Sequence, residues 1–347
     1  MLKITKDIIF KKSNKPILIA EISGNHGGSK KRFLQLIKSA YENGADIVKI
    51  QSYEPKDITL GIKNESFRIK KGIWKNKYLW DLYKQAHTPF KWHSDAFKLA
   101  KLKKKIIFSS PFSIRAVDML EKLNVKLYKI SSFEITDFKL IDYIASKNKP
   151  IILSTGMAEL SEVKKAIKCI NKYHNKIVIL HCVSGYPTKL SDSNLIKIKF
   201  LQKHFKNNLV GLSDHTNNII SKIASYPLGV VAIEKHFTLN KKFKSADKEF
   251  SIDPTQLKKL SVILKDLQSS FNNQENKNIE YNSKKLRRSI FAKKNIRKGE
   301  KFDFQNIDTL RPKIGICASQ FSNIIKKRAK TSRKSGSPIF KNQILMR

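Results

Sequence analysis

The chain contains little cysteine, glycine or proline for its 347 residues. Its three cysteines, Cys169, Cys182 and Cys317, form no Cys-x-x-Cys pair, so we expect no disulfide framework, no cysteine-based zinc site and a reducing, cytoplasmic location. Only 13 glycines and 10 prolines are present, which excludes fibrous and low-complexity classes. No apolar run approaches the roughly 18 residues of a membrane span, and no signal peptide is expected. A membrane partner is therefore not predicted.

Acidic residues are also scarce, with 28 Asp and Glu against 70 Lys and Arg, a net charge of +42. Such an excess is typical of nucleic-acid-binding proteins. Here the lysines are spread along a chain that is also rich in Asn and Ile, which favours a general lysine bias and predicts no nucleic-acid partner. One concentration exists, because residues 287–347 carry 17 basic against 3 acidic residues.

Short runs rich in β-branched residues recur along the first 240 or so residues, and such near-continuous apolar runs are typical of parallel strands covered on both faces. Segments with helical periodicity lie between them, over 29–44, 113–124 and 161–173. In the first, Ser29 is the expected N-cap and Gly44 follows the end. The eight strands are predicted at 16–23, 45–53, 105–112, 127–134, 150–157, 176–184, 209–215 and 230–237.

Eight such units predict a (β/α)8 TIM barrel. The alternative is an open doubly wound sheet, which is disfavoured because no glycine-rich dinucleotide fingerprint follows any strand. We expect a barrel over 1–271 that ends with a helix at 255–271, a polar linker at 272–285 and a small β-rich domain at 286–347. The stretch 54–104 is too long for an ordinary connection and predicts an insertion over the active-site face.

The chemistry of TIM barrels lies at the carboxyl ends of the strands, and here nearly every predicted strand ends in polar side chains. Burying these groups without a purpose would be costly. Two of them, Lys49 and Lys129, lie inside apolar strands, and lysines beside hydroxyls favour a small anionic substrate, a phosphate or a carboxylate. The candidates include Glu21, Lys49, Gln51, Ser110, Lys129, Ser132, Glu134, Ser154, Tyr186, Ser213, His215, Glu234, Lys235 and His236.

Two histidines end successive predicted strands. Neighbouring strands lie about 4.8 Å apart, so His215 and His236 would both reach one divalent metal and leave positions open for substrate. Structural or hydrogen-bonding roles are the alternative for both. His26 is a third candidate for the site, and Cys182 is expected to belong to the core.

The strand ends resemble the sialic acid synthase family in order and spacing. The matching segments are IAEISGNHGGS, ADIVKIQSY, FSSPFS, YKISSFE, ILSTGMA, HCVSGYPT, GLSDHT and EKHFTL. The segments RRSIFAKKNIRKGE and LRPKIG resemble the antifreeze-like (SAF) domain of that family. The resemblance implies a TIM barrel followed by a SAF domain.

The resemblance also implies a reaction, in which phosphoenolpyruvate condenses with the open-chain aldehyde of an amino sugar, water adds and phosphate leaves. It implies that Glu21, Glu134 and Lys129 are catalytic and that Mn²⁺ or Mg²⁺ binds His215 and His236. The implied phosphoenolpyruvate ligands are Lys49, Lys129, Ser132, Ser154 and Ser213. The other implied substrate-binding residues are Gln51, Ser110, Tyr186, Asp247 and Arg311.

Within the family, the segments 70–93 and 245–253 resemble the pseudaminic acid synthase branch, in which Trp74, Trp80 and Phe90 are expected to cover a sugar methyl group. The alternative is an N-acetylneuraminate or legionaminate synthase. A Schiff-base aldolase using Lys129 or Lys49 and a basic nucleic-acid-binding protein are the other classes considered. The resemblance further implies a homodimer in which the SAF domain, through Arg311, covers the partner's active site.

Overall fold

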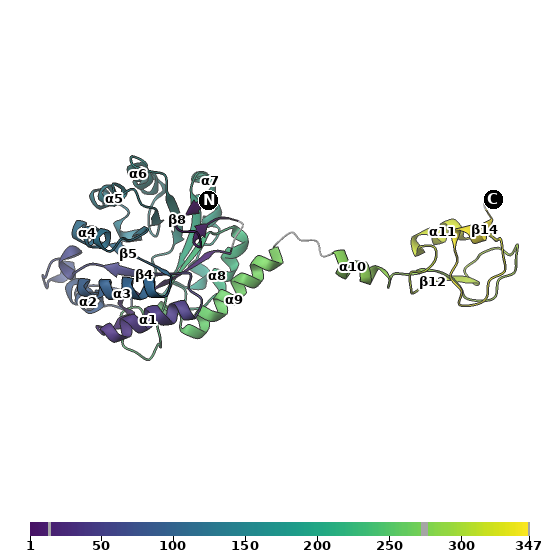
Figure 1. Ribbon diagram of the computed structural model, residues 1–347, viewed down its shortest axis with the longest axis horizontal. Helices are drawn as coiled ribbons and strands as arrows, with labels where there is room; N and C mark the ends of the chain where they lie inside the picture. The colour runs from purple at the N-terminus through teal and green to yellow at the C-terminus, as the bar shows by residue number, and fades with distance from the viewer. Residues whose placement is uncertain (13–14, 272–276, 346–347) are drawn as a thin grey trace. The chain divides into compact units, whose positions relative to one another are not determined.

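Eight parallel strands close into a barrel in the first of two compact units, Met1–Phe271 (Figure 1). The computed structural model describes residues 1–12, 15–271 and 277–345. The strands follow chain order around the barrel, and β10 pairs with β3 to close it. They are β3 (Ile17–Glu21), β4 (Ile47–Ser52), β5 (Ile106–Pro111), β6 (Tyr128–Ile130), β7 (Ile151–Ser154), β8 (Ile177–Cys182), β9 (Leu209–Asp214) and β10 (Ala232–His236). All eight lie within the runs predicted as strands, so the TIM-barrel prediction is confirmed.

Helices cover the outside of this barrel. In α1, Ser29 caps the first turn by accepting a hydrogen bond from the backbone N–H of Arg32, and the face with Phe33, Leu36 and Ile37 is fully buried, as the 3.6-residue period requires. The helices are α1 (Lys30–Glu42), α3 (Phe90–Leu102), α4 (Ile114–Lys122), α5 (Phe138–Ala145), α6 (Leu160–Ile170), α7 (Lys197–His204), α8 (Ile220–Ser225) and α9 (Pro254–Phe271). A short hairpin of β1 (Leu2–Lys3) and β2 (Ile9–Phe10) precedes the barrel.

The insertion after β4 is shorter than the predicted stretch 54–104. Helix α3 packs against α1 and β5, so it is the barrel's own helix between β4 and β5. The additional chain therefore ends before Phe90 and contains two short 3-10 turns and α2 (Leu79–Ala86). The prediction erred because α3 follows the insertion without a break, and its amphipathic pattern was grouped with it.

The second unit, 272–347, has its own small core. Strand β11 (Ser289–Ala292) pairs antiparallel with β12 (Ile307–Leu310), and β13 (Arg328–Ala329) pairs with β14 (Ile344–Leu345). Helix α10 (Lys277–Lys284) precedes them and α11 (Phe321–Ile324) lies between the two pairs. Of the predicted linker, 272–276 lies outside the described residues and the part that follows is helical rather than irregular.

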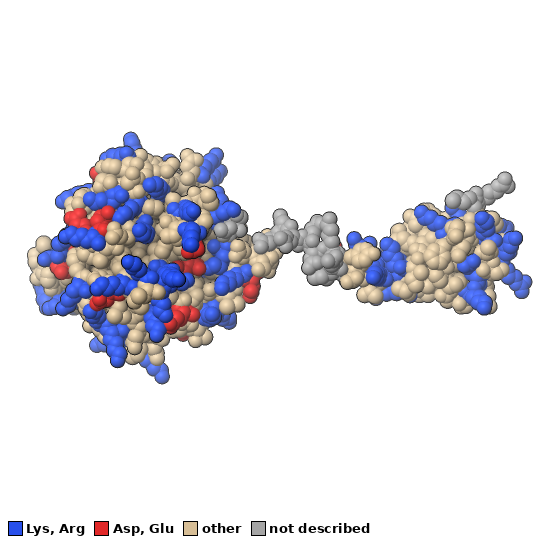
Figure 2. All heavy atoms as spheres, viewed as in Figure 1, with Lys and Arg blue, Asp and Glu red and all other residues tan. Residues whose placement is uncertain are grey.

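Lysine and arginine side chains are distributed over the visible face of each unit, with fewer acidic side chains between them (Figure 2). This distribution agrees with the diffuse lysine content of the sequence. Within the described ranges, no helix combines the length and the apolar character needed to span a bilayer.

Candidate active site

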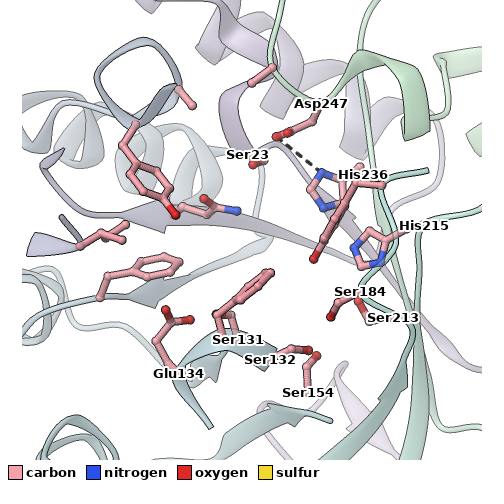
Figure 3. Close-up of a pocket in the computed structure, with 18 of the residues that line it drawn as sticks. Ser23, Ser131, Ser132, Glu134, Ser154, Ser184, Ser213, His215, His236 and Asp247 are labelled. Atoms are coloured by element: carbon pink, nitrogen blue, oxygen red, sulfur yellow. Dashed lines mark ion pairs between the residues drawn. The ribbon is translucent and has the colours of Figure 1, made fainter. Parts of the chain in front are cut away.

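The carboxyl ends of the strands surround a cavity of about 400 Å³ (Figure 3). Its walls combine lysines and serines from the strand ends with two histidines and with apolar residues of the insertion. Most of the candidate residues meet here. The predicted residues that line it are Lys49, Gln51, Lys129, Ser132, Glu134, Ser154, Tyr186, Ser213, His215, Glu234, His236 and Asp247.

Several predicted site residues are not among those that line the cavity. Glu21 is fully buried behind the wall, where its carboxylate accepts a hydrogen bond from Gln51 Nε2 (3.0 Å) and pairs with Lys49 Nζ (3.1 Å). Ser110 is buried beside the wall, and its hydroxyl has no hydrogen-bond partner among the described residues. Arg311 is exposed on the second unit.

His26 is not part of the cavity, so its candidacy was wrong. The short helix η1 (Ser23–His26) turns its ring away from the barrel mouth, where Nε2 contacts Thr88 Oγ1 at 3.2 Å. The ring packs edge-on against Phe33 and Trp92 and is fully buried. Its contacts are those of a core residue.

One end of the cavity is suited to an anion. Lys129 Nζ donates to Ser154 Oγ at 2.7 Å, and Ser132 Oγ accepts a hydrogen bond from the backbone N–H of Gly156 at 2.9 Å. Ser213 lies on the same wall and donates to Glu234 Oε1 at 3.0 Å. Burial lowers the pKa of Lys129 to about 8, which leaves it mainly protonated at neutral pH.

Glu234 was listed among the polar strand ends, but the sequence assigned it no role. Its carboxylate lies between Lys49 Nζ (3.4 Å) and Lys129 Nζ (4.0 Å). Burial opposes ionisation, yet the two lysines hold the pKa of Glu234 below its usual value, and Glu234 with Glu21 raises the pKa of Lys49 despite burial. The sequence did contain one indication of its position. Glu234 lies two residues before His236, so both side chains lie on the same face of the strand.

Burial shifts the pKa of two other carboxyl groups toward neutrality. Burial raises the pKa of Glu134 to about 7, and one of its oxygens has no hydrogen-bond partner among the residues described. Burial also raises the pKa of Glu21 to about 7, against the opposing charge of Lys49. A carboxyl group with a pKa near 7 exchanges protons readily at neutral pH.

The two histidines at the ends of β9 and β10 face each other across 5.3 Å between ring centroids. His215 Nδ1 lies 3.1 Å from the carbonyl of Val183, which fixes the ring and leaves Nε2 free when Nδ1 carries the proton. His236 Nδ1 is 3.8 Å from Asp247 Oδ2 and has no hydrogen-bond partner within the described part of the chain (Figure 3). Burial lowers the pKa of both rings, that of His215 to about 4, so both are neutral.

Neutral imidazoles are ligands for divalent metals, and an unpartnered buried ring nitrogen fits such a role. No group of three or more His, Cys, Asp or Glu in the described ranges is arranged to hold a metal. A metal on His215 and His236 would therefore complete its coordination with water or substrate, as Lewis-acid chemistry requires.

A buried charge network supports the loop that carries His215. Asp214 accepts hydrogen bonds from the backbone N–H of Thr216 (2.8 Å) and pairs with both Lys222 and Lys235. Lys235 therefore points away from the cavity, on the opposite face of β10 from Glu234. The network fixes the turn after β9.

The insertion forms the other end of the cavity. Trp74 lines it, and Trp74 Nε1 donates to the carbonyl of Ala246 at 3.0 Å. Trp80 and Phe90 do not line it, and the ring of Phe90 lies against His93 and Arg115 instead. Of the three aromatic residues expected to cover a methyl group, only Trp74 is placed to do so. Cys182 is buried, as expected, and also reaches the cavity wall.

The NeuB family matches residues 36–276 of the chain, and the SAF domain matches residues 287–345. The chain belongs to the NeuB family. The family resemblance inferred from the motifs is thereby confirmed, as is the SAF domain after the barrel. The match of the NeuB family includes every strand end from Lys49 to His236, and the SAF match includes Arg311.

Several relatives support this assignment. The pseudaminic acid synthase of Helicobacter pylori is 38% identical over 95% of this chain and 98% of its own length. The pseudaminic acid synthase of Campylobacter jejuni is 36% identical over 95% and 97%. An N,N'-diacetyllegionaminic acid synthase of Campylobacter jejuni is 35% identical over 92% and 97%.

Among solved structures, the N-acetylneuraminic acid synthetase of Leptospira borgpetersenii superposes on this NeuB-family chain with a TM-score of 0.69 at 27% identity. The superposition covers 78% of this chain and 92% of that one. The barrel described above is therefore the fold of a solved sialic acid synthetase.

Proposed function

We propose that this NeuB-family chain is a pseudaminic acid synthase, a transferase that condenses phosphoenolpyruvate with 2,4-diacetamido-2,4,6-trideoxy-L-altrose and water and releases phosphate. The observation that carries the proposal is one cavity in which buried lysines and serines lie beside two neutral histidines. The full-length similarity to two pseudaminic acid synthases selects the branch.

Phosphoenolpyruvate would occupy the lysine and serine end of the cavity. Lys49 and Lys129 neutralise its phosphate and carboxylate, and the hydroxyls of Ser132, Ser154 and Ser213 donate hydrogen bonds to their oxygens. The buried carboxylate of Glu234 keeps the lysine pair ordered before substrate binds, because it lies between both ammonium groups.

His215 and His236 would hold Mn²⁺ or Mg²⁺, which when bound polarises the sugar aldehyde and stabilises the alkoxide that forms. The chain's own contribution is to keep both imidazoles neutral and oriented. The carbonyl of Val183 orients His215, and Asp247 lies beside His236.

Glu134 would act as the proton acceptor. Carbon 3 of phosphoenolpyruvate forms the new bond to the aldehyde carbon, whose oxygen takes up a proton and becomes a hydroxyl. Water then adds at carbon 2 and gives its proton to Glu134, whose pKa of about 7 suits this step. Cleavage of the bond between carbon 2 and the phosphate oxygen then releases phosphate, which takes the remaining hydroxyl proton of carbon 2, so that the 2-keto acid forms. Glu134 gives up the proton it accepted, which balances the proton taken up by the aldehyde oxygen. Gln51, Tyr186 and Asp247 would orient the sugar.

A panel of sugars tests the branch. We expect the diacetamido-trideoxy sugar to give phosphate release from phosphoenolpyruvate at least about 10-fold faster, as kcat/KM, than N-acetylmannosamine, because a missing polar substituent leaves binding groups unpaired. A diacetamido precursor of legionaminic acid belongs in the panel, because a legionaminate synthase is 35% identical over 92% of this chain. Faster turnover of N-acetylmannosamine would contradict the proposal.

We also propose that the enzyme acts as a homodimer in which the SAF domain of one subunit covers the barrel of the other, with Arg311 contacting the sugar. The proposal rests on the family resemblance. Arg311→Ala should raise the KM of the sugar about 30-fold and leave that of phosphoenolpyruvate unchanged, because one charge-assisted hydrogen bond is lost. Arg297→Ala, on the same domain, is the control.

Mixed dimers test whether Arg311 acts on the active site of the partner subunit. A heterodimer of Arg311→Ala and His236→Ala subunits contains one barrel with both histidines, facing an intact Arg311 from its partner. Complete exchange in an equal mixture should therefore restore about a quarter of the wild-type activity, and the purified heterodimer should have about half of it. A purified heterodimer without recovery would contradict the arrangement.

A further inference from the structure

The insertion gives the cavity a second end that differs in chemistry from the lysine and serine end. Its aliphatic lining comes from Ile58, Ile69, Leu79 and Leu82, and Tyr53 lies beside them. We call these five residues the apolar lobe. Three of them, Ile58, Ile69 and Leu79, are only half-buried, and all three line the cavity. Their side chains therefore keep apolar surface that a ligand can cover. Such surface favours an apolar group of a ligand.

The apolar lobe is held in place by the barrel. Trp74 Nε1 donates to Ala246 in the loop after β10. Helix α2 packs on η1 so closely that a methyl group placed on Gly24 would lie 2.9 Å from Cβ of Ala86. The lobe is therefore preformed, and a ligand need not order it on binding.

Tyr53 adds one polar group to the lobe. Its side chain is only 3% exposed, and its ring packs edge-on against Tyr83 (5.8 Å) and Phe112 (5.2 Å). The Tyr53 hydroxyl makes no hydrogen bond to any described residue, although it lines a cavity. The hydroxyl is not among the fully buried polar atoms that lack a partner, so it is accessible from the cavity, where a ligand can supply an acceptor.

We propose that the apolar lobe is the subsite that selects the sugar, with Ile69 and Leu82 against its 6-methyl group and the Tyr53 hydroxyl donating to the carbonyl oxygen of its 4-acetamido group. The inference rests on the proposed function and deepens it. The two contacts differ in their consequences. An apolar wall discriminates only modestly against an added hydroxyl, whereas a hydroxyl built to donate a hydrogen bond discriminates strongly against a sugar without the acceptor.

Two substitutions separate these contacts. Tyr53→Phe should lower kcat/KM for the diacetamido-trideoxy sugar about 10- to 30-fold and leave kcat/KM for N-acetylmannosamine within about 2-fold, because only the former carries the 4-acetamido acceptor. Ile69→Asn should lower the preference for a 6-methyl over a 6-hydroxymethyl sugar about 10-fold. The KM of phosphoenolpyruvate should not change in either variant.

The chain offers matched controls. Tyr226→Phe removes the same hydroxyl outside the cavity, and Ile62→Asn makes the same change at an exposed position of the insertion. Thermal melting shows that each variant folds. If wild type turns over both sugars and Tyr53→Phe lowers both equally or neither, the subsite assignment is overturned. If wild type releases no phosphate with any sugar, the proposed function itself is overturned.

Discussion

His236→Ala should reduce phosphate release at least about 1,000-fold while the barrel stays folded. A Lewis acid at the aldehyde oxygen contributes several kcal/mol to the transition state, and each 1.4 kcal/mol is about a tenfold change in rate. The substitution removes one of the two candidate ligands. It breaks no hydrogen bond of Nδ1 to a described residue, because that atom has none and lies 3.8 Å from Asp247. The barrel should therefore remain folded, and the loss of stability should come from the lost packing against His215 and Phe250.

Metal binding gives this prediction a readout that does not depend on activity. Dialysis against a chelator should abolish turnover by wild type, and Mn²⁺ or Mg²⁺ should restore it. Calorimetric titration of Mn²⁺ should give one site in wild type and at least about 100-fold weaker binding in His236→Ala. His204→Ala, which removes an exposed histidine of α7 outside the cavity, is the control. Normal turnover or normal Mn²⁺ affinity in His236→Ala would show that the metal assignment is wrong.

The barrel and most of its cavity were predictable because two simple rules act together. A strand covered on both faces must be apolar almost throughout, so polar residues such as Lys49 and Lys129 inside strands are conspicuous. In a closed parallel barrel, all strands end at the same rim. Side chains at the strand ends can therefore be predicted to lie close together even when their contacts are unknown. This is why His215 and His236 were expected together before their distance was known.

The errors arose where the backbone path between strands decides the outcome. His26 lies five residues after Glu21, but η1 carries its ring under α1 instead of toward the mouth. The insertion was predicted to extend to residue 104 because no sequence signal separated it from α3. Glu234 was named only as a strand end, since its position beside Lys49 depends on the register of β10, β3 and β4. Its approach to Lys129 depends on β6, a strand that pairs with none of these three. Strand register and loop direction depend on tertiary contacts, so they cannot be predicted from the local patterns of a single sequence.

Lys129→Met should raise the KM of phosphoenolpyruvate about 100-fold, because the anionic substrate loses a charge-assisted contact in a buried site. The same residue should set the alkaline limit of the reaction. Burial lowers the pKa of Lys129 to about 8, so the ammonium is present below that pH and is lost as the pH rises through it. For wild type, kcat/KM for phosphoenolpyruvate should therefore fall above pH 8, since this parameter reports ionisations of the free enzyme.

Lys49, the other buried lysine of the cavity, provides a comparison. It separates the contribution of Lys129 to phosphoenolpyruvate binding from its contribution to the alkaline limit. Although burial opposes it, Glu21 and Glu234 raise the pKa of Lys49, so Lys49 stays charged throughout this pH range. Lys49→Gln should lower kcat/KM and keep the decline above pH 8, whereas Lys129→Met should lower kcat/KM and remove the decline. Both profiles should be measured at constant ionic strength, because salt screens the attraction for the anion. A decline that persists in Lys129→Met would assign the alkaline ionisation to another group and leave Lys129 without the proposed role.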